Sequence, residues 1–443
     1  MRQFTGLRFA PLASCALMGL AAASPAMAGG FAVREQSAEF QGMSFAGAAA
    51  AGGGLSGMFW NPAVAAYAPK GYSSESDAAL ILGNIDITAK AGTTLLGSPG
   101  LAADTGNMAK PALVPASYMA YRLSENAVLA LSLNSPFGLA TDPPNRAWVG
   151  QTHNRLSELK TFNAAPTLAV RLAPGLSVGF GAQIEYVEGK FQNAFPSLPT
   201  APTALDISVE GKDTAYGFTA GVNWAPTSQT SIGLGYRSAI NHNLKGSISI
   251  PASPIPAQVT GNPTEVALTL PDIATLSLRQ SLNDKLRVTG TVEWTHWSDV
   301  QKLEVDCPSL GAPFCTNANH IANSIPLRWV DGWMFALGGE YDFNKQLQLR
   351  SGIAYEMSPI QDPINRTTGL PDQNRFYLSG GASYKLSDML TADLAYTHFW
   401  GLGGGTDRNQ PVLAPPGSFV RVVGDVSESA DIISGAIKFK LNP

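Results

Sequence analysis

The chain has 443 residues, including 45 Gly and 31 Pro, and only 14% of its residues are charged. The formal net charge of −4 gives no excess of basic residues of the kind that nucleic acid binding needs, so we expect no nucleic acid partner. So few charges, with a near-neutral mean hydropathy, are unusual for a soluble protein of this length. They suit a membrane barrel with an apolar outer wall and a polar lumen.

The first residues are typical of an export signal. Arg2 and Arg8 give a positively charged start, an apolar stretch follows, and Ala26-Met27-Ala28 provides the small residues that signal peptidase recognises. We therefore expect residues 1–28 to be a signal peptide and the mature chain to begin at Gly29. The protein should then be exported across the inner membrane.

An alternative interpretation of the leader is a lipoprotein cleavage box that ends at Cys15. This box follows Arg8 too closely to leave a usable apolar core before it. Beyond the leader, no run approaches the ~18 apolar residues that a membrane helix requires. A chain that crosses a membrane without such helices has to do so as a closed barrel.

Two cysteines remain after removal of the leader, Cys307 and Cys315, and they flank a short segment with Pro and Gly. In an oxidising compartment, the simplest arrangement for such a pair is a disulfide. The alternative is a metal-binding pair, but no histidine or second cysteine pair lies at ligand spacing. We expect a disulfide, no metal site and no cofactor.

From about residue 71 onward, apolar and polar residues alternate with a period of two, which indicates strands with different surroundings on their two faces. Between Lys285 and Trp297, for example, Val288 and Val292 share one face, and Arg287 shares the other with its polar neighbours. A charge on the lipid face would cost about 2–4 kcal/mol at mid-membrane. We expect the charges on the polar face to form a salt-bridge network in the lumen, with direct ligand contact as the alternative. These charged residues are Arg287, Glu293, Arg350, Glu356, Arg375 and Asp393.

Short and long connections alternate along the chain. The short ones lie near residues 124–126, 173–175, 226–228, 283–284, 343–345 and 387–388, and the long ones near 89–112, 138–157, 190–213, 248–271, 300–327, 358–374 and 401–429. Tight periplasmic turns and extended external loops produce this alternation in outer-membrane barrels. A soluble sandwich or propeller has no reason to sort its loops by length. The predicted fold is all-β, a transmembrane antiparallel β-barrel of about fourteen strands that spans residues 71–443.

Residues 29–70 differ from the rest because they are rich in Gly and Ala and show no clear alternation. A segment of this size is too small to fold alone. A wide barrel offers it a place in the lumen. We therefore predict an N-terminal hatch, or plug, over residues 29–70.

Several motifs along the chain resemble the FadL/TodX (OmpP1) family of outer-membrane transporters for long-chain fatty acids and aromatic hydrocarbons. They follow one another in family order over almost the whole mature chain. The motifs are Gly29-Gly-Phe-Ala-Val-Arg-Glu-Gln-Ser37, Phe59-Trp-Asn-Pro-Ala63, Ser135-Pro-Phe-Gly-Leu-Ala-Thr141, Gly235-Tyr-Arg-Ser238, Leu270-Pro-Asp272, Glu293-Trp-Thr-His-Trp-Ser298, Arg350-Ser-Gly-Ile-Ala-Tyr355 and Leu370-Pro-Asp-Gln-Asn-Arg-Phe376.

The resemblance implies fourteen strands and roles for several residues. Asn61, Pro62 and Ala63 match a hatch motif that lies against an inward kink in the third strand. That kink falls here at Pro136, Phe137 and Gly138 and implies a sideways opening of the barrel wall. Phe31 matches an aromatic residue that lies beside the ligand and moves during gating.

The residues themselves also favour a kink at Pro136. Proline has no N–H group for a neighbouring strand, and Gly138 adds backbone freedom. The alternative is that Pro136 only marks the point where the strand becomes an external loop.

A fatty-acid carboxylate in an apolar pocket needs a basic partner, because burying it unpaired is costly. Lys190 and Arg328 lie near strand ends that correspond to such positions, and they are our candidates for the head group. A neutral aromatic hydrocarbon would need neither residue.

The sequence therefore predicts passive uptake of hydrophobic compounds, most simply long-chain fatty acids, across a Gram-negative outer membrane, with release through the barrel wall. Neutral aromatic hydrocarbons are the alternative cargo, and a water-filled porin or a surface receptor is the alternative class. Gly52-Gly-Gly-Leu-Ser-Gly57 fits a nucleotide-binding pattern, but no strand precedes it, and nothing marks a catalytic nucleophile, so we expect no enzyme. The expected surroundings are outer-membrane lipid and lipopolysaccharide, and we expect a monomer.

Overall fold

The computed structural model describes residues 29–194, 206–250, 259–307, 321–411 and 419–441. No helix in these ranges is long and apolar enough to cross a membrane. The short helices are α2 (Ala38–Gln41), η2 (Leu55–Phe59), η3 (Pro62–Tyr67) and η4 (Trp297–Asp299). The strands are β1 (Tyr72–Ala89), β2 (Ala112–Arg122), β3 (Ala127–Asn134), β4 (Gly138–Thr141), β5 (Leu156–Ala173), β6 (Leu176–Ala194), β7 (Asp206–Trp224), β8 (Thr230–Arg237), β9 (Ile240–Ile250), β10 (Val259–Leu270), β11 (Ile273–Ser281), β12 (Leu286–Thr295), β13 (Lys302–Asp306), β14 (Ile321–Pro326), β15 (Gly332–Asp342), β16 (Leu347–Met357), β17 (Arg375–Lys385), β18 (Leu390–Gly401), β19 (Gly404–Pro411) and β20 (Phe419–Leu441).

These strands form one antiparallel sheet that closes on itself, because β1 pairs with β20 along its whole length, from Tyr72–Leu441 to Ala89–Gly424. Six of the 20 strand segments (β4, β9, β10, β13, β14 and β19) are the outer pieces of broken wall strands, so 20 − 6 = 14 strands surround the lumen. Closure pairs the edge groups that hydrocarbon would leave unsatisfied. The predicted barrel of fourteen strands is confirmed.

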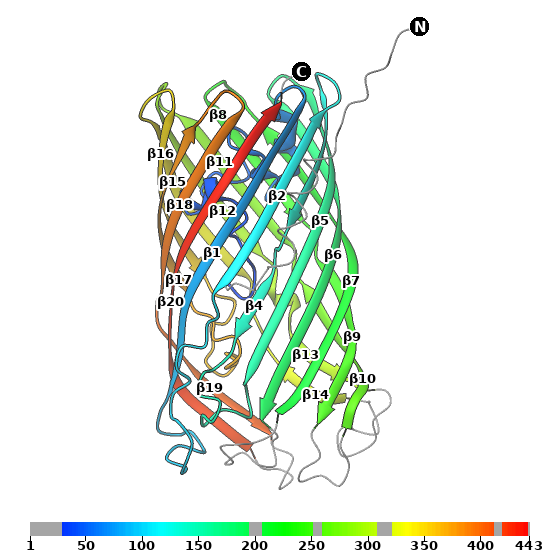
Figure 1. Ribbon diagram of the computed structural model, residues 1–443, viewed down its shortest axis with the longest axis vertical. Helices are drawn as coiled ribbons and strands as arrows, with labels where there is room; N and C mark the ends of the chain where they lie inside the picture. The colour runs from blue at the N-terminus through cyan, green and yellow to red at the C-terminus, as the bar shows by residue number, and fades with distance from the viewer. Residues whose placement is uncertain (1–28, 195–205, 251–258, 308–320, 412–418, 442–443) are drawn as a thin grey trace.

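Short turns join the strands at one end of the barrel, and the long connections lie at the other end (Figure 1). The short turns follow β2, β5, β7, β11, β15 and β17, as the sequence predicted. The C-terminus lies at the same end as these turns. This end is the periplasmic one in an outer-membrane barrel, and the end with long connections faces outward.

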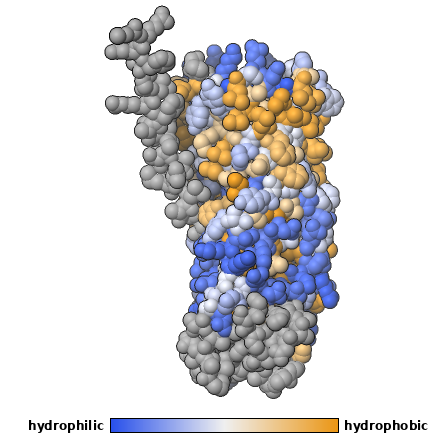
Figure 2. Space-filling model, turned by 90° about the vertical axis from the view of Figure 1, so that its right-hand side faces the viewer, coloured by the Kyte–Doolittle hydropathy of each residue, from blue (hydrophilic) through white to orange (hydrophobic). Residues whose placement is uncertain are grey.

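An apolar belt covers the half of the barrel near the short turns, and Figure 2 shows it in orange on one face of the molecule. Its side chains point outward and are exposed, among them Leu337 at 66% and Leu394 at 63%. The predicted faces are confirmed in β12, where Val288 and Val292 are exposed and Arg287 is buried. This belt is the part of the wall that lipid covers.

Beyond the belt, the strands continue further outward than the sequence predicted, and their pattern is inverted. In β9, Asn243 and Lys245 are exposed, whereas Leu244 and Ile248 are buried inside. Water surrounds this outer part of the wall, so its outer face is polar, and the blue band in Figure 2 lies there. An apolar inner face is stable only when other apolar groups pack against it. The inside of these outer strands is therefore part of the candidate site.

The N-terminal segment, residues 29–70, lies inside the barrel, where the dark blue trace with α2, η2 and η3 is enclosed by the strands (Figure 1). Its side chains are mostly buried, and Phe40, Phe59 and Trp60 pack together in its centre. Ser37 begins α2 by accepting a hydrogen bond from the N–H of Phe40, and Asn61 begins η3 in the same way through Ala63. The segment fills the lumen at the level of the apolar belt.

Replacing Leu337 with Arg tests the assignment of the apolar belt. Leu337 lies at the middle of β15, so the charge would enter hydrocarbon, and we expect the free energy of unfolding in lipid vesicles to fall by about 2–4 kcal/mol. Asn243→Arg, on the water-exposed outer face of β9, is the matched control and should change it by less than about 0.5 kcal/mol. Equal losses in both variants would contradict this placement of the membrane.

Candidate functional site

A network of buried ion pairs joins the N-terminal segment to the wall. Arg34 donates to Glu293 on β12 at 2.6 Å and also pairs with Glu356 on β16. Arg375 on β17 pairs with Glu428 on β20 and with Asp372, both at close range. The network confirms that the charges on the polar face meet in the lumen. It also includes charges of the N-terminal segment, which the sequence did not indicate.

Wall glycines allow the backbone of the N-terminal segment to touch the barrel directly. A Cβ atom on Gly233 would lie 1.8 Å from the carbonyl oxygen of Ala49, and one on Gly235 would lie 1.8 Å from that of Trp60. Such distances exclude any side chain, because the backbone atoms of the segment cannot yield as a flexible side chain can. The inner face of β8 is therefore fitted to this segment.

Asn61 fixes the middle of the segment against β7. Its side-chain amide donates to the carbonyl oxygens of Ala49, at 2.7 Å, and Val222, at 3.0 Å. Pro62 and Ala63 follow it and lie against Gly179 of β6. The hydrogen bonds of this motif go to β7, to Ser177 of β6 and to the segment itself.

The third wall strand is broken between β3 and β4 at Ser135, Pro136 and Phe137. Pairing of β2 with β3 ends at Ser117–Leu133, whereas β2 remains paired with β1 as far as Ala112. Residues 112–116 of β2 therefore have no β3 partner, which leaves a gap in the hydrogen-bond ladder of the wall.

Residues 31–36 of the N-terminal segment bond to the chain at this wall break. The N–H of Val33 donates to the carbonyl of Pro136 at 2.8 Å, and the N–H of Gly138 donates to the carbonyl of Phe31 at 2.8 Å. Gln36 donates from its side chain to the carbonyl of Ser135, also at 2.8 Å. The segment thus provides partners that the neighbouring strand does not.

An aromatic cluster surrounds Phe31 directly inside the break. Its ring centroid lies 4.7 Å from that of Trp297, 5.8 Å from that of Trp329 and 6.0 Å from that of Phe137. The four rings belong to one buried cluster that continues into the apolar inner face of the outer strands. Members of this continuation include Leu159, Val187, Leu244, Val266 and Leu270.

The structure separates the two basic residues that the sequence suggested for a ligand head group. Lys190 lies on the outward-facing side of β6, in step with the exposed Phe180 and Ile184, and its nearest acid is Glu210 at 3.8 Å. Arg328 lies in the loop between β14 and β15 with a φ of 50°, a left-handed conformation that is uncommon for a residue other than glycine. Binding of a head group by Lys190 stays a prediction.

Sequence reasoning missed Arg408, which lies close to Arg328. Arg408 is buried on the inner face of β19 and donates to the carbonyls of Ile364 and Pro326, both at 3.0 Å. Burial lowers the pKa of its guanidinium, and the like charge of Arg328 lowers it further. His153 is buried nearby, and burial lowers its pKa to about 4, so it is neutral at pH 7 and adds no charge. Arg408 could be recognised as a candidate only from its position on β19, after a break in the wall strand, and the sequence does not reveal that break.

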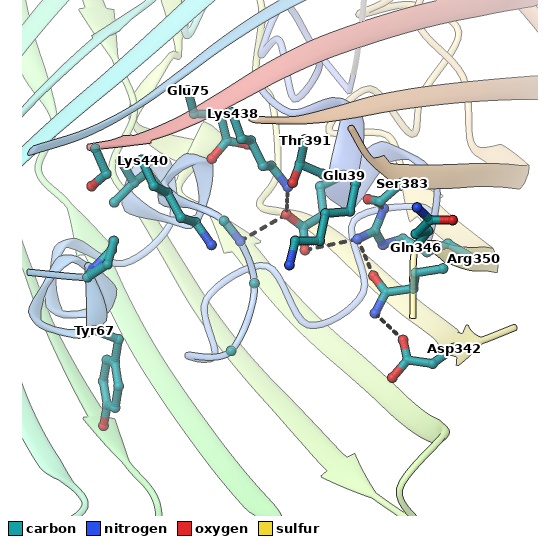
Figure 3. A pocket seen from close by; sticks show the side chains of 18 of the residues that line it. Glu39, Tyr67, Glu75, Asp342, Gln346, Arg350, Ser383, Thr391, Lys438 and Lys440 are labelled. Atoms are coloured by element: carbon teal, nitrogen blue, oxygen red, sulfur yellow. Dashed lines mark hydrogen bonds and ion pairs between the residues drawn. The ribbon is translucent and has the colours of Figure 1, made fainter. Parts of the chain in front are cut away.

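A vestibule of ≈890 Å³, lined in part by charged side chains, opens at the periplasmic end, next to the N-terminal segment. Figure 3 shows Glu39 of α2 between two cations of the wall, Lys438 on β20 and Arg350 on β16. Lys438 also pairs with Asp393 at 2.7 Å. These contacts tie α2 to the wall on the side that faces the periplasm.

Two groups of side chains have the spacing of metal ligands. Asp272, His296 and Asp299 form one group near η4, and Glu39, Glu75 and Asp393 form the other. The ammonium group of Lys438 pairs with all three acids of the second group and supplies its positive charge. We assign a metal ion to neither group.

The predicted disulfide involves Cys307, which is fully buried at the outer end of the barrel. Its predicted partner, Cys315, lies outside the described residues, so the disulfide stays a prediction. The predicted signal peptide, residues 1–28, lies outside the described residues as well.

Comparisons with known proteins agree with this architecture. A family model described as "Outer membrane protein transport protein (OMPP1/FadL/TodX)" matches residues 19–440. Outer membrane protein P1 of Haemophilus influenzae is 29% identical over 423 residues, covering 86% of this chain and 88% of that protein. A long-chain fatty acid transport protein of Escherichia coli is 24% identical over 411 residues, covering 85% and 88%. The crystal structure of a Pseudomonas aeruginosa FadL homologue has the same fold, with a TM-score of 0.80 at 21% identity, covering 93% of this chain and 99% of that one.

Replacing Lys438 with Met tests whether this lysine holds the N-terminal segment. Removing one partner of a buried ion pair leaves acids uncompensated, and we expect a loss of about 3–5 kcal/mol in the stability of the docked segment. Faster hydrogen exchange of residues 38–56 would report this loss. Lys440→Met, on the same strand and also lining the vestibule, is the control and should leave exchange unchanged. Unchanged exchange in the Lys438 variant would contradict the assignment.

Proposed function

Because the chain belongs to the OMPP1/FadL/TodX family of outer membrane transport proteins, we propose that it takes up long-chain fatty acids by passive diffusion and releases them sideways through its wall. The protein is an outer-membrane transporter of hydrophobic compounds. The choice of cargo, the route of release and the roles of single residues are the parts that we propose. The observation that supports them best is the broken third strand, where residues 31–36 of the N-terminal segment bond to Ser135, Pro136 and Gly138.

The ligand would enter from outside along the apolar inner face of the outer strands. The outer strands are polar on their outer face and apolar on their inner face, as the buried Leu244 and Val266 illustrate. This is the opposite of the membrane-spanning part of the wall. An apolar lining inside a water-surrounded cylinder favours a hydrophobic molecule, because burying its surface removes apolar area from water. The aromatic cluster around Phe31 would then form the inner end of the binding pocket.

Movement of residues 31–36 would open the wall, and we propose that the whole segment of residues 29–70 acts as the hatch. Phe31 packs on Phe137, and the adjacent main-chain bonds of Val33 and Gly138 cross the break. A ligand that displaces the Phe31 ring would strain those bonds and expose the gap beside β2. Release would then occur into the membrane, while Asn61 and the Lys438 contacts keep the rest of the hatch in place.

The head group of a fatty acid would find its counter-charge at Arg328 and Arg408. These two arginines lie at the outer end of the aromatic cluster, and none of the ion pairs among the described residues involves either of them. The described residues include every Asp and Glu of the chain. Two cations without an acid partner favour an anion, which supports a carboxylate as part of the cargo.

Three alternatives can be separated from this function by experiment. Neutral aromatic hydrocarbons would use the same route without needing the arginines. A general porin would conduct ions steadily, whereas the hatch fills the lumen at the level of the belt, so we expect almost no conductance in a planar bilayer. A surface receptor would bind a partner protein without any effect on uptake.

Identification of the natural cargo tests the proposal most directly. The protein would be extracted in native form, and the copurifying small molecules would be identified by mass spectrometry. Fatty acids in the pocket would support the proposal, and neutral aromatics alone would favour the alternative cargo.

Replacing Gly138 with Leu should block uptake and leave the barrel intact. The side chain would fill the break where the N–H of Gly138 meets the carbonyl of Phe31. We expect at least a tenfold lower initial rate of radiolabelled oleate uptake in a Gram-negative host without its own transporter of this kind, equivalent to about 1.4 kcal/mol. Gly290→Leu is the control, because a Cβ there meets only ordinary contacts, at 3.6 Å from Leu337 and 3.7 Å from Ala336. Oleate uptake at the parent rate in the Gly138 variant would count against a lateral opening.

Replacing both Arg328 and Arg408 with Gln should weaken oleate binding and spare neutral ligands. Loss of charge-assisted hydrogen bonds worth about 1.5–3 kcal/mol corresponds to about a 10- to 100-fold higher Kd. Titration calorimetry with oleate and with toluene would measure it. An equal loss for both ligands would indicate damage to the pocket and contradict a head-group role.

A further inference from the structure

Arg237, in the motif Gly235-Tyr-Arg-Ser238, has no role in the scheme above. It is the last residue of β8, and its side chain points into the lumen and is buried, with 5% exposed. A guanidinium group carries five N–H donors and stays charged, so burying one requires acceptors or an acid. The surroundings of Arg237 show which of these it has.

Neutral groups alone contact Arg237. It donates to the side-chain oxygen of Gln183 and, at 3.3 Å, to the carbonyl of Phe59, and its Cζ atom lies 4.6 Å from the centre of the Phe59 ring. No ion pair among the described residues, which include every Asp and Glu, involves it. Three of its five donors are therefore without a protein acceptor in the described part of the chain.

The nearest acids are committed to other groups. Glu293 accepts from Arg34 at 2.6 Å and from Thr275 at 3.0 Å. Glu185 accepts from Asn163 at 2.9 Å and faces His242 at 3.5 Å. Both acids act on Arg237 only at longer range, so its direct hydrogen-bonding positions stay open.

The open side of Arg237 borders the wall break. A small cavity is lined by Arg237, by Ala32 and Val33 of the hatch and by Pro136 of the break. Glu293 lines it as well, and the charge of this acid is paired with Arg34. The cavity volume of ≈10 Å³ holds about one water molecule. Val33 and Pro136, which are joined by a main-chain hydrogen bond at the break, both line this cavity. Any movement of Val33 away from Pro136 therefore opens the break and enlarges the cavity beside Arg237 together.

We propose that Arg237 binds the carboxylate of the departing ligand at the wall break and so helps to select acidic amphiphiles for lateral release. The inference rests on the proposed function and deepens it. A carboxylate that leaves the outer arginines must pass the low-dielectric break next to the membrane, where an uncompensated charge is costly. Arg34 lines the same cavity but is occupied by Glu293 and Glu356, which leaves Arg237 as the available cation among the residues that line it.

The test compares Arg237→Gln and Arg237→Lys with a matched control, Arg171→Gln. Arg171 resembles Arg237 in its contacts, because it donates to a hatch carbonyl, that of Ala66 at 3.0 Å, and lies over a hatch ring, that of Tyr67 at 5.0 Å. It lies at the periplasmic end, away from the break. Loss of general hatch anchoring should therefore affect both arginine positions, whereas loss of carboxylate binding should affect only Arg237.

Initial rates of uptake would be measured for radiolabelled oleate and radiolabelled toluene in the transporter-deficient host, after assembly of each variant is checked by its heat-modifiable migration. We expect Arg237→Gln to lower the oleate-to-toluene ratio of rates about 10- to 100-fold, the effect of losing a charge-assisted hydrogen bond. Arg237→Lys should restore most of the ratio because it keeps the charge, and Arg171→Gln should leave the ratio unchanged.

Three results would overturn the inference, and they differ from one another. A ratio that is unchanged in Arg237→Gln would remove the carboxylate role and leave the transport proposal standing. Uptake of toluene without oleate by the parent protein would show that no carboxylate passes the break. Uptake of neither compound would reject the proposed function itself, and with it any role of Arg237 in release.

Discussion

Pairing of backbone hydrogen-bonding groups is the constraint on which this structure depends. Hydrocarbon offers no partner for an unpaired N–H or C=O group, so the wall closes from β1 to β20 without a free edge. The third strand departs from that rule at Pro136, and the N-terminal segment supplies partners there. Residues 31–36 therefore help to close the wall at this point, so the N-terminal segment is bonded to the barrel where its third strand is broken.

Two physical features hold the segment in the lumen, and they act on different sides of the barrel. Ion pairs of Arg34 and Glu39 join it to strands on one side of the barrel, while wall glycines such as Gly233 admit its backbone on the other side. Ion pairs are specific and costly to leave half-made, whereas backbone contact depends only on shape. The part near the break is held by the hydrogen bonds of Phe31, Val33 and Gln36, by the packing of the Phe31 ring and by the ion pairs of Arg34.

The barrel, its strand number and its lipid face followed from the sequence because alternation is strict wherever lipid and a polar lumen face one strand. The outer strands were read as long connections because their pattern is inverted and weaker, as in β9. Breaks in the strands also make it harder to predict which side chains face the lumen, because one extra residue moves all following side chains to the other face of the sheet. At the break between β8 and β9, for example, Arg237 faces Thr219 of β7, whereas Lys245 faces Lys212 of β7. Eight residues on one strand thus correspond to seven on the other, which is a shift of one residue.

Residues of the candidate site were only partly accessible to sequence reasoning. Phe31 and the break at Pro136 were identified because proline and the motif resemblance mark them. Arg408 was missed because only three-dimensional proximity to Arg328 makes it notable, and Lys190 was placed without knowledge of which face of β6 it occupies. Charge balance in the lumen likewise depends on Arg34 and Glu39, whose partners lie hundreds of residues away along the chain.

The glycine lining of the wall has a consequence for how such a protein can change over time. Where the backbone of the wall touches the backbone of the segment, the contact depends on the course of the segment's main chain and not on the identity of its side chains. Small residues in the stretch around Ala49 are thus interchangeable with other small residues, whereas any exchange at Gly233 or Gly235 would expel the segment. Substitutions should therefore accumulate in the N-terminal segment at this contact, and none should be tolerated at the glycines of the wall.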